Sequence, residues 1–303
     1  MKEETGETYQ SSQYAKSLCL SVAKDGKSCF LVASILGVLP WQKFGGVVDR
    51  PSHLHVLSVD SDAMGGVMGF LSKTCAAPAE ALKFRIYNMQ DDAMRVAMDK
   101  EGNDLTFYNT IMNTMVTIQE RVQKERGVHA VLFSSLTNIG ATLLRGLSGD
   151  PADKGGGMDI DKNNRFGGMI KELQLWGQID DWHCFWEAHL YKKAPIPKPG
   201  EVQQPPKDSL LLRGQVGEQF PVNVEQIFRI RRNHGQPHAG TKCDEMWVDT
   251  RAASDFVAGG RLFTENLNSK EPDLTVALHK LGKQVGRWGA KSAAPKPQAL
   301  KAK

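Results

Sequence analysis

The chain has 303 residues, a formal net charge of +4, 41% hydrophobic residues and 24% charged residues. This is the composition of an ordinary globular protein, long enough to bury a core in one large domain or two small ones. The net charge is too small to indicate nucleic-acid binding by itself. No apolar run approaches the roughly 18 to 20 residues that span a bilayer, and the polar, acidic start excludes a secretory signal.

The cysteines are dispersed along the chain and form no C-x-x-C pair. An odd, scattered set favours reduced thiols in a cytoplasmic protein and argues against a zinc site. The five residues are Cys19, Cys29, Cys75, Cys184 and Cys243.

The first predicted elements are a flexible leader over residues 1–16 and a strand over residues 17–23. A helix is predicted from the next loop to about Leu36, because Gly37 and Pro40 follow as stop signals. The loop fits the P-loop spacing G-x-x-x-x-G-K-[ST], except that a serine stands at the first glycine. It reads Ser21-Val22-Ala23-Lys24-Asp25-Gly26-Lys27-Ser28.

This pattern has a physical mechanism. Backbone N–H groups at a helix N-terminus cradle phosphates, a lysine reaches the outer phosphates, and a hydroxyl ligates Mg²⁺. Lys27 and Ser28 stand at the lysine and hydroxyl positions, and the flanking strand and helix supply the required context. The predicted nucleotide-binding residues are Ser21, Lys24, Asp25, Gly26, Lys27, Ser28 and Cys29, with Ser28 as the metal ligand.

The second predicted strand covers residues 54–60 and ends in an acid. Asp60 and Asp62 therefore lie where open α/β sheets place their ligands, although a turn or a helix cap explains them equally well. A flexible turn is predicted at Gly65-Gly66, then a short helix at 79–82 and a strand at 84–87. Apolar residues at spacings of three or four predict a long helix over 104–126, whose apolar face is core.

The next strand is predicted over residues 128–133 and is followed by Ser134. A glycine-rich loop is expected at 149–157, a helix at 163–179, and a strand at 182–189 that ends in His189. His189 is a candidate polar residue at a ligand site or an ordinary hydrogen-bonded histidine at a strand end. Strands that alternate with helices predict βαβ units and a mainly parallel sheet flanked by helices.

Prolines predict an extended loop over residues 192–207, before short strands at 209–213, 226–232 and 245–250. We expect antiparallel pairs there, which would extend the same sheet, and a last short helix at 273–281. Basic residues around the second of these strands could face nucleic acid or simply be solvated: Arg229, Arg231, Arg232 and Lys242. The predicted organisation is one domain over 17–285 and a disordered basic tail over 286–303.

The order of these pieces over about residues 17–283 resembles the RecA-like P-loop ATPases of bacteriophages, AAA-type nucleotide-binding proteins that include single-strand-annealing recombination factors. The resemblance includes Gly259-Gly260-Arg261-Leu262 and Glu271-Pro272-Asp273-Leu274. It implies a RecA-like core, ATP with Mg²⁺, and a role in phage DNA recombination or replication. It also implies single-stranded DNA and a single-strand-binding protein as partners, a homo-oligomer, and the host cell cytoplasm.

The resemblance also implies residue roles. Asp60 and Asp62 match acids that orient the attacking water, His189 matches a sensor of the γ-phosphate, and Arg261 matches a phosphate-contacting or intersubunit arginine. The chain departs from the family where Ser134 replaces the aspartate that supports Mg²⁺. Together with Ser21 at the first glycine, this predicts nucleotide binding with weak or absent hydrolysis.

Two other functions remain open from the sequence. The chain could be a catalytically inactive P-loop protein with a structural or interaction role, with Ser21 and Ser134 marking lost chemistry. A metabolic P-loop kinase is the third alternative, and the absence of a recognisable acceptor-substrate motif argues against it.

Overall fold

The computed structural model describes most of the chain between Tyr14 and Asp249, with gaps, and a few residues beyond it. The described residues are 14–22, 26–40, 42, 51–98, 104–148, 160–193, 207–212, 215–232, 246–250, 259–260 and 274. The predicted leader, glycine-rich loop and basic tail lie largely or wholly outside these ranges, so the domain division stays a prediction.

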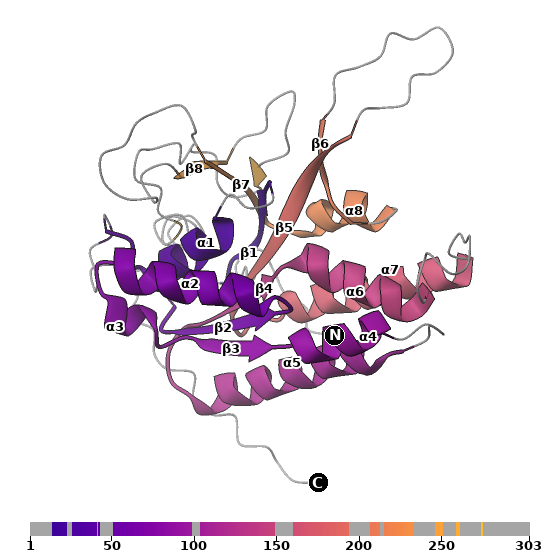
Figure 1. The fold of residues 1–303 in the computed structure, drawn as a ribbon, viewed down its shortest axis with the longest axis horizontal. Coiled ribbons are helices and arrows are strands. Elements are labelled where there is room, and N and C mark those ends of the chain that lie inside the picture. Colours follow the sequence, from indigo (N-terminus) through magenta and orange to yellow (C-terminus); the bar gives the residue numbers. More distant parts are fainter. Residues whose placement is uncertain are drawn as a thin grey trace, which may run out of the picture.

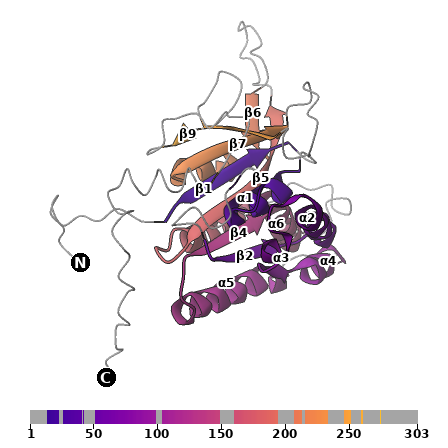
Figure 2. The ribbon, with the colours of Figure 1, turned by 90° about the vertical axis from the view of Figure 1, so that its left-hand side faces the viewer.

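One mixed sheet organises the described residues, and Figure 2 shows its strands one after another from β7 to β2. The strand order is β3-β2-β4-β5-β1-β7-β8, with β6 paired to β5 and β9 to β7. The strands are β1 (Lys16–Ser21), β2 (His53–Ser58), β3 (Arg85–Asn88), β4 (His129–Ser134), β5 (His183–Lys193), β6 (Lys207–Leu210), β7 (Gln226–Arg232), β8 (Met246–Asp249) and β9 (Gly259–Gly260).

The pairs among β3, β2, β4, β5, β1 and β7 are parallel, whereas β6, β8 and β9 pair antiparallel. The predicted α/β class with a mainly parallel sheet and antiparallel C-terminal strands is confirmed. One detail of the prediction was wrong: β7 pairs with β1 in parallel. Only its partners β8 and β9 run against it.

Helices cover both faces of the sheet (Figure 1). The helical segments are α1 (Lys27–Leu36), α2 (Ser61–Thr74), α3 (Pro78–Ala81), α4 (Gln90–Met98), α5 (Thr106–Lys124), α6 (Leu136–Ser148), α7 (Ile160–Gly177), α8 (Gln215–Gln219) and a 3₁₀ turn at Phe220–Asn223. One hydrophobic core packs α1, α2 and α3 against one face of the sheet. A second core packs α4, α5, α6, α7 and the 3₁₀ turn against the other face. Because both faces are covered, every residue of β1 and of β4 is buried.

The predicted elements agree with the observed ones to within a few residues, with clear exceptions. Gly65-Gly66 lie inside α2 and not in a turn, because Met64, Val67 and Leu71 bury one face of that helix. Helices α4, α6 and α8 were not predicted from the sequence, and α6 begins two residues after the end of β4. Only Leu274 of the last predicted helix is described.

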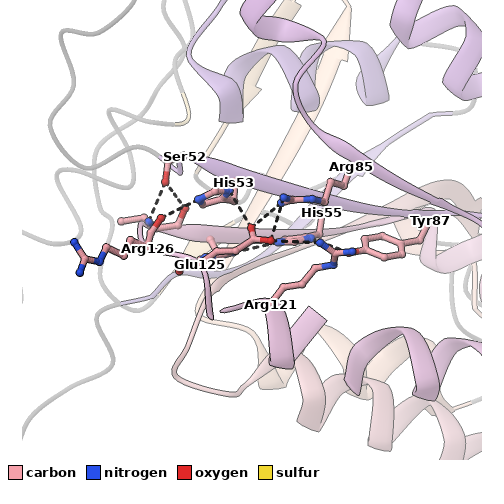
Figure 3. Close-up of polar contacts among 10 residues, drawn as sticks. Ser52, His53, His55, Arg85, Tyr87, Arg121, Glu125 and Arg126 are labelled. Carbon is pink, nitrogen blue, oxygen red and sulfur yellow. Dashed lines mark hydrogen bonds and ion pairs between the residues drawn. The ribbon is translucent and has the colours of Figure 1, made fainter. Parts of the chain in front are cut away.

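A polar cluster lies where β2 and β4 begin, and Figure 3 shows its members. His55 and His129 are buried there, and His55 Nε2 lies 3.1 Å from His129 Nδ1 in a hydrogen bond. His55 Nδ1 shares a second hydrogen bond with the Tyr87 hydroxyl at 3.2 Å, and His129 Nε2 lies 3.3 Å from the Glu125 carbonyl oxygen. This chain of contacts ties β2, β3 and β4 to the C-terminal end of α5.

The Glu125 carboxylate contacts several basic side chains of the same cluster. Arg85 donates to both carboxylate oxygens at 3.0 and 3.1 Å, and Arg121 lies 3.3 Å from Oε1. His53 Nδ1 lies 3.5 Å from Oε2. Burial, with the neighbouring His129 ring and the positive charge of Arg85, lowers the pKa of His55 to about 3, and burial also lowers the pKa of His129. The two buried rings are therefore neutral at pH 7.

In the part of the chain that is described, no helix is both long and apolar enough to cross a bilayer. Cys19, Cys29, Cys75 and Cys184 carry free thiols, and Cys243 lies outside the described residues.

Candidate functional site

The junction between β1 and α1 has the backbone geometry that the P-loop spacing predicts. Gly26 precedes the first helical turn with φ 72° and ψ 19°, in the left-handed region that favours glycine. Its carbonyl accepts the first helical hydrogen bond, from the Phe30 N–H at 3.1 Å. A Cβ built on Gly26 would meet no described atom within 4 Å, its two chain neighbours aside. Lys24 and Asp25 lie outside the described residues.

The N-terminus of α1 is electropositive. Its first turn contains no acidic residue and, among the described side chains, no cap hydrogen bond. Cys29 packs against the apolar core, so its backbone N–H is the group that it offers at this end of the helix. The positive end of the dipole of this ten-residue helix therefore lies at the β1–α1 junction.

The Lys27 side chain is buried, with 5% of its surface exposed, and its Nζ lies 3.2 Å from Glu187 Oε1. Glu187 belongs to β5 and its side chain is 2% exposed. The Ser28 hydroxyl donates to the same oxygen at 2.7 Å. The two P-loop side chains that the sequence predicted thus meet on one carboxylate.

Ser134 completes this group from the other side. It is the last residue of β4, the position at which the resemblance placed a metal-supporting aspartate. Its hydroxyl donates to Glu187 Oε2 at 2.7 Å, and the two residues are register partners in the parallel β4–β5 pair. We call Lys27, Ser28, Ser134 and Glu187 the carboxylate cluster.

Glu187 was not predicted from the sequence. The available signal was a single acid within the apolar run Trp182–Ala188, two residues before the predicted sensor. An ionised carboxylate is costly to bury unless it is paired, so an isolated acid in a fully buried strand indicates a partner. The partner could not be identified because it depends on which strands become neighbours.

His189 lies beside this cluster. It is the register partner of Ser21, the last residue of β1, and its backbone N–H donates to the Thr137 hydroxyl at 2.9 Å. Burial lowers the pKa of His189, and the positive charge of Lys27 lowers it further, whereas Glu187 raises it. The structure therefore brings the predicted sensor, the strand end and the lysine together.

The two predicted acids lie farther along the sheet. Asp60 follows β2, and its carbonyl accepts hydrogen bonds from the Met64 N–H at 3.3 Å and the Ser58 hydroxyl at 3.1 Å. This backbone arrangement starts α2, which contains Asp62. Strands β4 and β5 lie between β2 and β1, so neither acid is on a strand next to the P-loop strand. Arg261 lies outside the described residues.

One of the basic residues of β7, Arg231, is ion-paired in the structure. Arg231 forms an ion pair with Asp249 of the neighbouring β8, with 2.8 Å between Nε and Oδ2 and 3.4 Å between a terminal nitrogen and Oδ1. This carboxylate offsets part of the positive charge on that edge. Lys242 lies outside the described residues.

The residues present suit a phosphate with a divalent cation. Backbone N–H groups and a lysine are the usual phosphate donors, and a hydroxyl beside a carboxylate offers the oxygen ligands that Mg²⁺ prefers. Lys27, Ser28 and Glu187 supply these groups within one buried cluster.

Comparisons with known proteins give structural likenesses only. No protein-family model matches the chain, and no curated protein matches it. Among solved structures, the chain is similar to the ATPase domain of G40P, with a TM-score of 0.40, 11% identity, and coverage of 74% of this chain and 72% of that one. A KaiC-like protein, PH0186 from Pyrococcus horikoshii OT3, gives a TM-score of 0.40, 10% identity and coverage of 84% and 86%.

A DnaB-like replicative helicase gives a TM-score of 0.37 at 10% identity, with 75% of this chain and 51% of that chain covered. These scores are too low to carry an argument about function. The geometry of the β1–α1 junction and of the carboxylate cluster is what indicates a function.

Proposed function

We propose that the chain binds ATP with Mg²⁺ at the junction of β1 and α1, as a RecA-like nucleotide-binding protein. The observation that carries the proposal is the buried Lys27 ammonium at the N-terminus of α1, paired with a carboxylate and next to the Ser28 hydroxyl. A phosphate can replace the carboxylate as the partner of the Lys27 ammonium, and the helix N-terminus adds backbone N–H donors.

Turnover is proposed to be weak or absent. Phosphoryl transfer depends on metal positioning and charge neutralisation, which Mg²⁺ supplies when it is bound. Ser134 stands where a carboxylate would support the metal directly, and Ser21 replaces the first P-loop glycine. Asp60 and Asp62 remain candidates for orienting water, and His189 remains a candidate γ-phosphate sensor.

The biological setting is proposed from the resemblance of the sequence alone. It is phage DNA recombination or replication, on single-stranded DNA, by a homo-oligomer that meets a single-strand-binding protein in the host cytoplasm. Arg261 would contact phosphate or a neighbouring subunit in that setting.

Titration of a fluorescent ATP analogue tests the nucleotide site. We expect the wild-type protein to bind with Mg²⁺ and Lys27→Ala to lose at least about tenfold in affinity, since one charge-assisted contact contributes about 1.5–3 kcal/mol. Lys73→Ala is the matched control, because Lys73 is an exposed lysine on α2. Equal affinity for wild type and Lys27→Ala would contradict the proposal.

An inactive structural protein is the second candidate function. The observation that favours it is the ion pair itself, which already neutralises the lysine that a phosphate would need. Wild-type protein that binds no ATP analogue at any Mg²⁺ concentration would select this candidate. If ATP binds, single-stranded oligonucleotide should bind in its presence and raise any turnover; no effect of the oligonucleotide would remove the recombination role.

A further inference from the structure

We propose that Glu187, on β5, is the carboxylate that supports Mg²⁺ at this site, in place of the acid that is missing at Ser134 on β4. This inference rests on the proposed nucleotide function. It assigns the metal role to a residue one strand away from the position at which the resemblance expects it.

Glu187 lies between two serine hydroxyls. Its two carboxylate oxygens bind two different hydroxyls, Ser28 at 2.7 Å and Ser134 at 2.7 Å. Ser28 is the P-loop hydroxyl expected to ligate the metal, and Ser134 marks the end of the strand that was expected to carry the acid. The carboxylate therefore lies between the two places from which a metal is normally held.

The sheet register explains how an acid on β5 can serve. Ser134 and Glu187 are partners in neighbouring parallel strands, so their backbones are about 4.8 Å apart. Because glutamate is one methylene longer than aspartate, its carboxylate can cross that spacing. The observed hydrogen bond between the two side chains shows that it reaches Ser134.

The charge balance at Glu187 changes when a nucleotide binds. In the protein without nucleotide, Lys27 is the cation nearest to the Glu187 carboxylate among the described contacts. A phosphate that takes the Lys27 charge leaves a buried carboxylate without a full cationic partner, which is unfavourable. A divalent cation beside Glu187 removes this cost. Nucleotide and Mg²⁺ binding should therefore be strongly coupled, and the coupling should depend on Glu187.

A purely structural role for Glu187 makes a different prediction. If the carboxylate only neutralised Lys27, its removal would free the lysine and strengthen nucleotide binding equally with and without Mg²⁺. A metal-supporting role predicts that binding without Mg²⁺ is kept or strengthened, whereas the additional affinity gained with Mg²⁺ is lost.

The test is titration of a fluorescent ATP analogue, in Mg²⁺ and in EDTA, with wild type, Glu187→Gln and the double variant Ser134→Asp/Glu187→Gln. We expect Glu187→Gln to lose about tenfold or more of the Mg²⁺-dependent affinity, the range found when groups that orient a metal are removed. The double variant, which returns an acid to β4, should regain it. Asp249→Asn is the matched control, because Asp249 is a buried, ion-paired acid on β8.

The outcomes separate the two proposals. Wild-type protein that binds no nucleotide refutes the proposed function, and this inference with it. Normal nucleotide binding with wild-type Mg²⁺ dependence in Glu187→Gln refutes only the assignment of Glu187. If Glu187→Gln does not fold, the double variant decides, since it keeps one carboxylate in the β4–β5 register pair of residues 134 and 187. A folded double variant without Mg²⁺-dependent affinity overturns the inference.

Discussion

The pair between Lys27 and Glu187 makes a quantitative prediction for the protein without nucleotide. Glu187→Gln keeps the shape of the side chain and an oxygen for one serine hydroxyl, but it leaves the Lys27 ammonium without its carboxylate. Because both side chains are at most 5% exposed, water cannot replace the lost partner. The variant should therefore be strongly destabilised.

The magnitude follows from the burial of the pair. Removing one partner of a buried ion pair costs about 3–5 kcal/mol, and the retained hydrogen bond places Glu187→Gln near the lower end, at about 3 kcal/mol. For a chain of 303 residues, whose unfolding entropy is about 0.64 kcal/mol/K, that loss lowers Tm by about 5 °C. Lys27→Met should cost a similar amount for the converse reason. The variant Lys27→Met/Glu187→Gln removes both charges together. Its loss of unfolding free energy should be smaller than the sum of the two single losses, by about 2 kcal/mol or more.

Urea unfolding of wild type, both single variants and the double variant measures these free energies. Lys124→Met is the control, because its pair with Glu120 is exposed and should contribute less than about 1 kcal/mol. If the unfolding free energy of Glu187→Gln lay within about 1 kcal/mol of the wild-type value, or if the effects of the two substitutions were strictly additive, the pair would not be a coupled, buried unit.

Two further predictions concern packing and pH. Gly177→Ala should destabilise the protein by about 1–3 kcal/mol, because the new Cβ would overlap the Trp186 indole. Gly168→Ala in the same helix has open space at its Cβ and should stabilise the protein by up to about 1 kcal/mol. Thermal unfolding compares the two variants, and equal shifts in Tm would be inconsistent with the packing. The His55 pKa of about 3 lies below its unfolded value of about 6.5, so the unfolded chain binds the proton first as pH falls. The free energy of unfolding should therefore decrease as pH drops from 6.5 to 3, by at most about 1.4 kcal/mol per pH unit. Urea unfolding across this range should give a shallower pH slope for His55→Gln; an unchanged slope would exclude this histidine as the cause.

The P-loop side of the site could be predicted from sequence because it is local. Eight consecutive residues, an apolar strand before them and a helix after them contain the whole pattern, and the structure places Gly26, Lys27 and Ser28 at the start of α1. The left-handed backbone of Gly26 is also a local requirement. The alternation of strands and helices gave the mainly parallel sheet for the same reason.

The carboxylate side could not be predicted because it depends on contacts distant in sequence. Ser28 and Glu187 are 159 residues apart, and they meet only because β5 lies between β1 and β4 in the sheet. No periodicity within β5 encodes that neighbour relation. The error at Gly65-Gly66 has another cause: two glycines weaken a helix by about 1 kcal/mol each, and burial of the apolar residues of α2 outweighs that cost.

Ser134 has a different meaning in this site from the one its sequence position suggests. Read along the chain, it is a lost acid; in the structure, it donates a hydrogen bond that fixes one oxygen of Glu187, while Ser28 fixes the other. An aspartate at 134 would place a second negative charge next to a buried carboxylate, which is unfavourable unless one of the two is protonated. Under the proposed metal role, serine on β4 and glutamate on β5 are therefore complementary choices, and the absence of the acid at 134 follows from its presence at 187.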